Sequence, residues 1–116
     1  KAIKVKGGTM RLGSYDCDIL PNTKASKIYK KKTISERHRH RWEVNNKFVK
    51  KMESHGLIFS GMNKDLGVVE IIELADHPWF VACQFHPELK SRVDKAHPLF
   101  REFVKASLKE KQNGTK

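Results

Sequence analysis

The stretch VACQFHPEL, Val81 to Leu89, constrains the fold most, because an apolar strand runs directly into a histidine and a proline. Strand alternation places Phe80, Ala82, Gln84 and His86 on one face and Val81, Cys83 and Phe85 on the other. Both faces are largely apolar, which predicts an inner strand of an α/β sheet covered by helices. Pro87 ends this strand, because it has no amide hydrogen and biases the preceding residue toward an extended backbone.

His86 therefore leaves the carboxyl end of a buried strand, which is where open α/β sheets bind their ligands. Glu88 follows two residues later and can turn back to hold one imidazole nitrogen as a donor. The two residues are thus candidates for a catalytic base and the group that orients it. The alternative is a His-Pro turn that only ends a strand. The residues alone leave both interpretations open.

Length and charge limit the possible architectures and partners. A chain of 116 residues suffices for one domain that buries a little under about 70% of its extended-chain surface. Lys and Arg number 24 against 13 acidic residues, a net charge of +11. This balance favours anionic partners such as nucleic acid, nucleotides or acidic lipid, but it does not choose among them.

The cysteines and the hydropathy of the sequence indicate in which cellular compartment the protein is expected. The two cysteines, Cys17 and Cys83, form no CxxC pair, and no secretory signal is recognisable, so we expect a reducing, cytoplasmic location without a disulfide framework. No apolar run approaches the roughly 18 residues of a membrane span. Lys1 begins in mid-pattern without an initiating Met, as if the chain were cut from something longer.

The other elements follow from periodicity and turn signals. We expect an extended segment over 9–20, a short helical turn over 24–32, a helix over 47–55 stopped by Gly56, a hairpin of 57–62 and 68–74, and a helix over 99–111. The inward positions are expected to be Met10, Leu12 and Ile19 in the first segment, Ile28 and Tyr29 in the turn, and Phe48, Val49 and Met52 in the middle helix. In the final helix they are Leu99, Phe100, Phe103, Val104 and Leu108. This apolar stripe should pack on the sheet. Residues 112–116 are expected to fray.

The segment ERHRHRWEVN, Glu36 to Asn45, alternates arginines with histidines. On an extended backbone Arg37, Arg39 and Arg41 point one way, and His38 and His40 point the other. Both rows cannot be buried unpaired, so one row should meet acids or an anionic ligand, and the planar fork of Arg suits a carboxylate or phosphate. Trp42 adds an apolar wall. A surface strand of mixed charge is the alternative.

Four motifs in order resemble the CTP synthase family, and its bacterial members most: GGTMRLG from Gly7, ERHRHRWEVN from Glu36, VEIIEL from Val69 and HPWFVACQFHPEL from His77. The resemblance runs from about Gly7 to about Lys109. It implies an α/β fold in which residues 1–111 form the C-terminal portion of a class I glutamine amidotransferase domain. That partial fold has a central, mostly parallel sheet with flanking helices and an antiparallel hairpin, followed by a frayed tail at 112–116.

The family makes CTP from UTP, ATP and glutamine, and its amidotransferase part supplies ammonia by hydrolysing glutamine. The resemblance implies that His86 and Glu88 are the catalytic pair, that Arg41 holds the glutamine α-carboxylate, and that the stretch Gly7 to Leu12 belongs to a lid loop through which GTP activates. It implies no cofactor and no metal in this part, with ATP and Mg²⁺ used by the full enzyme. The implied partners are glutamine, the remaining half of the domain, the synthase domain and further copies in a tetramer, with neither nucleic acid nor a membrane.

The sequence departs from the family in two places. Leu89 replaces a residue that is more often Phe, without consequence for the chemistry. The glycine-rich elbow that carries the nucleophilic cysteine is absent. Cys83 faces away from His86 about 10 Å along the strand, and Cys17 lies in a strand without an elbow. We therefore expect a fragment that supplies His86 and Glu88 but is inactive alone.

Two other classes of function remain as alternatives. A basic nucleic-acid-binding module would use the arginine row, Trp42 and the lysines, although no recognition motif is present. A zinc site would draw on His38, His40, Cys83 and His86, although the paired ligand spacings typical of structural zinc are missing.

Overall fold

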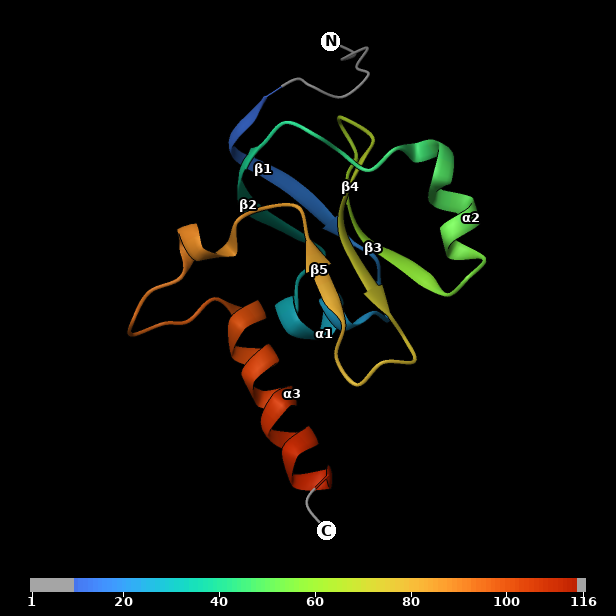
Figure 1. Ribbon diagram of the computed structural model, residues 1–116. Helices are drawn as coiled ribbons and strands as arrows, with labels where there is room; N and C mark the ends of the chain where they lie inside the picture. The colour runs from blue at the N-terminus through green and yellow to red at the C-terminus, as the bar shows by residue number, and fades with distance from the viewer. Residues whose placement is uncertain (1–9, 115–116) are drawn as a thin grey trace.

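The computed structural model describes residues 10–114, and Figure 1 shows a curled sheet with three helices around it. The strands are β1 (Arg11–Ile19), β2 (Thr33–His40), β3 (Leu57–Asn63), β4 (Val68–Leu74) and β5 (Val81–Cys83). The helices are α1 (Lys24–Tyr29), α2 (Val49–Glu53) and α3 (Pro98–Gly114), with 3-10 turns η1 (Asn46–Phe48) and η2 (Pro87–Lys90). The strand order is β2-β1-β3-β4-β5.

The mixed α/β class is confirmed, but the mostly parallel sheet is not. Each of the four strand pairings in residues 10–114 is antiparallel. The connection from β3 to β4 is the turn 64–67, and the connection from β4 to β5 is 75–80. A parallel crossover needs a dozen or more residues, so links this short require antiparallel neighbours. The predicted hairpin is present, and β5 pairs at one edge of the described sheet instead of forming the expected inner strand.

Strand β1 is where predicted, but it turns a different face inward. Met10 and Leu12 are exposed, at 46% and 68%, whereas Arg11 and Cys17 are buried. Ile19 is buried as expected. The odd-numbered residues therefore face the core, and the guanidinium at position 11 is accommodated there because Glu70 and Glu43 bind it.

The core gathers on one side of the sheet, beneath α1 and the start of α3. Its buried members are Cys17, Ile19, Ala25, Ile28, Ile34, Ile71, Phe85 and Leu99. Gly61 of β3 is required here, since a Cβ at that position would lie 2.7 Å from Ile71 Cγ1 and 2.8 Å from Cys17 Sγ. The predicted inward positions of α1 are confirmed, because Ile28 is buried and Tyr29 packs against the same cluster.

Helix α1 is held to the sheet by an acid of β4. The Glu73 carboxylate accepts hydrogen bonds from the backbone amides of Lys24, at 2.7 Å, and Ala25, at 3.1 Å. Thr23 caps the same helix end and accepts from the Ser26 amide. An anionic group satisfies the open amides of a helix N-terminus, and these two hydrogen bonds compensate for the burial of Glu73.

The middle helix is shorter than predicted. Asn45 caps η1 by accepting from the Lys47 amide, α2 ends at Glu53, and Gly56 adopts a positive φ of 98°. Val49 and Met52 are partly buried, but Phe48 is exposed at 53%.

Helix α3 extends away from the sheet in Figure 1, and only Leu99 of the helix is buried. The predicted apolar stripe is present in sequence, but Phe100, Phe103, Val104 and Leu108 are 40% to 57% exposed. The expectation that this whole stripe packs on the sheet is therefore wrong, since α3 leaves the sheet after its first turn. The helix continues to Gly114, three residues into the segment expected to fray, and 115–116 lie outside the described part. None of the helices within residues 10–114 has the length and apolar character to cross a bilayer.

Candidate functional site

His86 is fixed by backbone hydrogen bonds that continue beyond β5. The Gln84 amide donates to the Glu70 carbonyl at 2.8 Å, and the His86 amide donates to the Arg37 carbonyl at 2.9 Å. The backbone after β5 is thus hydrogen-bonded first to β4 and then to β2. Pro87 then begins η2, where its missing amide leaves no unpaired donor. The strand was expected to run up to the His-Pro dipeptide, but β5 already ends at Cys83, and Pro87 begins η2 instead.

His86 and Glu88 are in contact, as the sequence predicts. Nδ1 of His86 lies 2.7 Å from Oε2 of Glu88. Because a carboxylate accepts, Nδ1 carries the proton in this contact and Nε2 is the nitrogen left to take or give one. The hydrogen bond from His86 lowers the pKa of Glu88, so its orienting charge persists at neutral pH. The catalytic role of both residues remains a prediction.

Neither cysteine has the surroundings of a nucleophile. Burial raises the pKa of Cys17 and of Cys83 to about 12, so both thiols are protonated at neutral pH. The Cys83 thiol is 3.5 Å from the Phe85 carbonyl, and Cys17 is fully buried in the core. A reactive cysteine needs a lowered pKa and access, whereas both thiols have a raised pKa, Cys17 is buried and Cys83 is partly buried.

Arg41 lies one residue beyond the end of β2, on a segment without regular structure that runs to Asn45. Its side chain is exposed. The next residue, Trp42, offers its carbonyl to two donors: Gln84 Nε2 at 2.9 Å and His40 Nδ1 at 3.2 Å. Gln84 is two residues before His86, so the structure brings the Arg41 segment and the His86 segment together.

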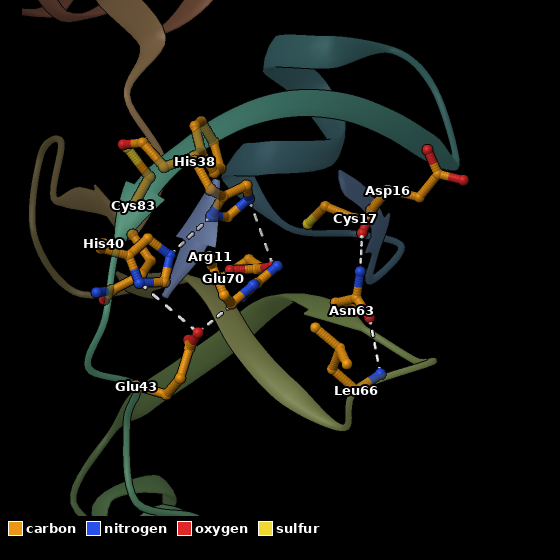
Figure 2. A network of polar contacts seen from close by, with 12 residues as sticks. Arg11, Asp16, Cys17, His38, His40, Glu43, Asn63, Leu66, Glu70 and Cys83 are labelled. Carbon is orange, nitrogen blue, oxygen red and sulfur yellow. Dashed lines mark hydrogen bonds and ion pairs between the residues drawn. The ribbon is translucent and has the colours of Figure 1, made fainter. Parts of the chain in front are cut away.

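A buried ionic cluster contacts the Arg41 segment through residues 42 and 43. Figure 2 shows the Arg11 network, which consists of Arg11, His38, His40, Glu43 and Glu70. Arg11 Nη1 donates to Glu43 at 2.9 Å and Nη2 to Glu70 at 2.7 Å. His38 Nδ1 lies 2.8 Å from His40 Nε2. The histidine row of β2 therefore faces inward to meet acids, while Arg37 and Arg39 face solvent.

The protonation states in the Arg11 network follow from burial. Burial lowers the pKa of His38 to about 3, with Arg11 adding to the effect, so this ring is neutral. Burial also raises the pKa of Glu70 to about 7 in spite of Arg11. His40 Nδ1 donates to the Trp42 carbonyl, so its Nε2 accepts from His38 Nδ1 when both rings are neutral.

A metal ion does not fit this cluster. Among the described residues, His38, His40 and Glu70 are the group whose ligand atoms lie within 4.8 Å of one another, and Cys83 and His86 of the zinc hypothesis are not part of it. The two histidines use facing nitrogens for each other. Arg11 already occupies the Glu70 carboxylate with a positive charge. A cation would have to displace both contacts.

Sequence reasoning missed the buried acids. The motif VEIIEL places Glu70 and Glu73 in an otherwise apolar strand, which was the available signal that each had a buried partner. Arg11 was assigned only to the lid stretch Gly7 to Leu12. Residues 7–9 of that stretch lie outside the described residues, and Arg11 itself is a core residue of β1.

The family model described as "Glutamine amidotransferase class-I" matches residues 1–106. The chain belongs to the class-I glutamine amidotransferase family. The chain is also similar to proteins that are named CTP synthase. The chain is 60% identical over 107 residues to a protein named CTP synthase from Chlorobium phaeovibrioides, covering 92% of this chain and 18% of the relative. It is 58% identical over 108 residues to the CTP synthase of Herpetosiphon aurantiacus, covering 93% and 20%.

A solved amidotransferase structure agrees with the fold. The Trypanosoma brucei structure titled "CTPS - glutaminase domain with bound acivicin" superposes with a TM-score of 0.81 at 34% identity, covering 86% of this chain and 40% of that one. The chain therefore spans about a fifth of the length of the curated relatives and less than half of the solved amidotransferase chain.

Proposed function

We propose that this chain is the part of a CTP synthase amidotransferase domain that supplies the histidine and glutamate for glutamine hydrolysis. The observation that carries the proposal is the contact between His86 Nδ1 and Glu88 Oε2 at 2.7 Å, which leaves Nε2 to act on a substrate. The similarity to proteins named CTP synthase supports the larger reaction, in which ammonia from glutamine converts UTP to CTP with ATP.

His86 acts first as an acid and then as a base in this proposal. After a thiolate attacks the amide carbon of glutamine, His86 protonates the leaving ammonia. It then takes a proton from the water that hydrolyses the thioester. Glu88 holds the ring in the required tautomer and stabilises the imidazolium. The trypanosome structure is titled as a glutaminase domain with bound acivicin, which supports a ligand site in the same fold.

Arg41 binds the α-carboxylate of glutamine in this proposal. Its exposed guanidinium stands on the segment that is hydrogen-bonded to the His86 segment through Gln84. A planar fork of donors binds a carboxylate through two parallel hydrogen bonds. Arg41 thus converts loose binding into a fixed alignment of the amide against His86.

The nucleophile comes from outside this chain, because Cys17 is buried, Cys83 is partly buried, and both thiols are protonated at neutral pH. The remaining half of the amidotransferase domain is its source. The exposed stripe of α3 and the edge strand β5 are the surfaces that this half would cover. Without it we expect no glutaminase activity. We place ATP, Mg²⁺ and UTP in the synthase domain, and no described residue is assigned to them or to GTP.

The test separates glutamine-dependent from ammonia-dependent CTP formation in the full-length protein that contains this chain. His86→Asn keeps size and some hydrogen bonding but cannot shuttle a proton at neutral pH. We expect it to lower the glutamine route by at least about 10² to 10⁴, the usual contribution of a general acid–base residue. The ammonia route should stay near normal, since ammonium salts bypass the amidotransferase site.

His55→Asn is the matched control, because His55 is an exposed histidine at the end of α2 whose Nδ1 contacts Ser54 and the Lys51 carbonyl. Both routes should survive that change. Loss of both routes in His86→Asn would assign the His-Pro turn to the fold alone. Survival of both would remove His86 from the mechanism.

A further inference from the structure

The Trp42 carbonyl is the point at which the Arg41 segment is attached to the rest of the site. Residues Arg41 to Asn45 belong to no helix or strand, so no backbone ladder fixes Arg41. Side chains from β1, β2 and the stretch after β5 help to hold the segment. Gln84 Nε2 and His40 Nδ1 both donate to the Trp42 carbonyl, and Arg11 binds the Glu43 carboxylate.

The backbone of Gln84 lies closer in sequence to His86 than the backbones of His40 and Arg11 do. Its amide is bonded to the Glu70 carbonyl, and its chain reaches His86 two residues later. His40 precedes Arg41 on β2 itself, and Arg11 belongs to β1. Gln84 alone among the three joins the segment of Arg41 directly to the segment of His86.

We propose that Gln84 is a positioning residue that sets Arg41 against His86, so that glutamine held by its carboxylate presents its amide to the imidazole. This inference rests on the proposed function. The physical reason is that a reactant must be held to within a fraction of an ångström of a productive pose, and a bond that fixes the backbone next to Arg41 narrows the poses of the segment that carries it.

The direction of the bond makes the proposal specific. A carbonyl oxygen only accepts, so Gln84 must present its NH₂ group to Trp42. Methionine has a similar length and no donor, so Gln84→Met removes the bond while filling the space. We expect Gln84→Met to raise the KM for glutamine about three- to tenfold, as the loss of one neutral hydrogen bond does. Ammonia-dependent CTP formation in the full-length protein reports whether the fold is intact.

Asn46→Leu is the matched control. Asn46 Nδ2 donates to the Gly67 carbonyl at 2.7 Å, which is also a side-chain amide bonded to a main-chain carbonyl near the same segment. Its partner lies in the β3–β4 turn, away from His86. The KM for glutamine should not change in Asn46→Leu. An equal rise in both variants would show general loosening of the segment and would overturn the role of Gln84.

A double-mutant cycle distinguishes positioning through Arg41 from any other role. Arg41→Ala should raise the KM roughly 30- to 150-fold, and adding Gln84→Met to it should have no further effect, since there is no guanidinium left to position. Additive effects would overturn the inference while leaving the function intact. If Arg41→Ala raises the KM and Gln84→Met does not, the inference also fails alone. If Arg41→Ala has no effect, the assignment of Arg41 fails, and the role of Gln84 fails with it.

Discussion

Two of the three His-Pro dipeptides in this chain form almost the same contact in different surroundings. His86, before Pro87, lies 2.7 Å from the Glu88 carboxylate, and His97, before Pro98, lies 2.6 Å from the Glu36 carboxylate. The first pair is 37% and 57% exposed, and the second is 3% and 2% exposed. The separation of the two atoms therefore does not distinguish a candidate catalytic pair from a structural one.

The difference lies in the second nitrogen of each ring. His97 Nδ1 accepts from the Leu99 amide at 3.1 Å, so both of its nitrogens are used, and Glu36 also accepts from the Tyr29 hydroxyl at 2.7 Å. That ring fastens the start of α3 to β2 and α1. His86 uses Nδ1 for Glu88, which leaves Nε2 for chemistry. A histidine with one nitrogen held and the other accessible is the one to examine for acid–base work.

The largest effect that this comparison predicts is on stability, at the buried pair. Glu36→Ala leaves the His97 and Tyr29 donors buried and unpaired, so we expect the free energy of unfolding of the protein to fall by about 3 to 5 kcal/mol. Equilibrium urea unfolding measures this. Glu88→Ala, the matched change in the exposed pair, should leave the midpoint unchanged. Equal shifts in the two variants would erase the distinction drawn between the pairs.

The second effect is on activity, at the exposed pair. Glu88→Gln keeps an acceptor for Nδ1 but removes the charge that stabilises the imidazolium, so glutamine-dependent CTP formation should fall, though less than in His86→Asn. Steady-state rates with glutamine and with ammonium salts measure it. The ammonia rate should hold. A glutamine rate equal to the wild type would place Glu88 outside the mechanism.

A smaller effect on stability is expected at the buried His97–Glu36 pair. Tyr29→Phe removes one of the two hydrogen bonds to Glu36 and keeps the ring beside His97, so we expect a loss of about 1.5 to 3 kcal/mol, below that of Glu36→Ala. Tyr15→Phe is the control, because it keeps the ring contacts with Arg11 and His38. Urea unfolding of the two variants compares them. A Tyr29→Phe loss as large as that of Glu36→Ala would mean that His97 contributes nothing to the pair.

The smallest effect is the pH response of Glu88. The hydrogen bond from His86 lowers the pKa of Glu88 in the folded protein. A carboxylate with a depressed pKa contributes stability above its unfolded pKa, and this is lost as the pH falls through the folded pKa. The contribution is small because the group is exposed. Carbon-13 NMR titration should show the Glu88 carboxyl ionising below the ordinary glutamate range, and His86→Asn should move its pKa upward. An unmoved pKa would contradict the contact.

Local patterns predicted the elements well and their partners poorly. The hairpin, α1 and β1 follow from alternation, turn residues and helix caps over a few residues, and the structure has them near the predicted bounds. The predicted parallel direction of the strand that begins at Val81 was wrong. Apolar residues on both faces are compatible with a parallel inner strand and with this antiparallel edge strand, so the pattern does not distinguish the two. The α3 stripe was misread for a related reason, since periodicity shows that a face is apolar but not what covers it.

The sequence by itself determined the His86–Glu88 contact, because Pro87 lies between the two residues and begins a turn that confines both. Only the tertiary structure decided which other charges are buried together. Arg11 meets Glu70 across 59 residues of sequence, and His97 meets Glu36 across 61. Such pairs depend on strand order and on which face of each strand turns inward, and a one-residue change of face in β1, β2 or β4 would have placed Arg11, Glu36 or Glu70 in solvent.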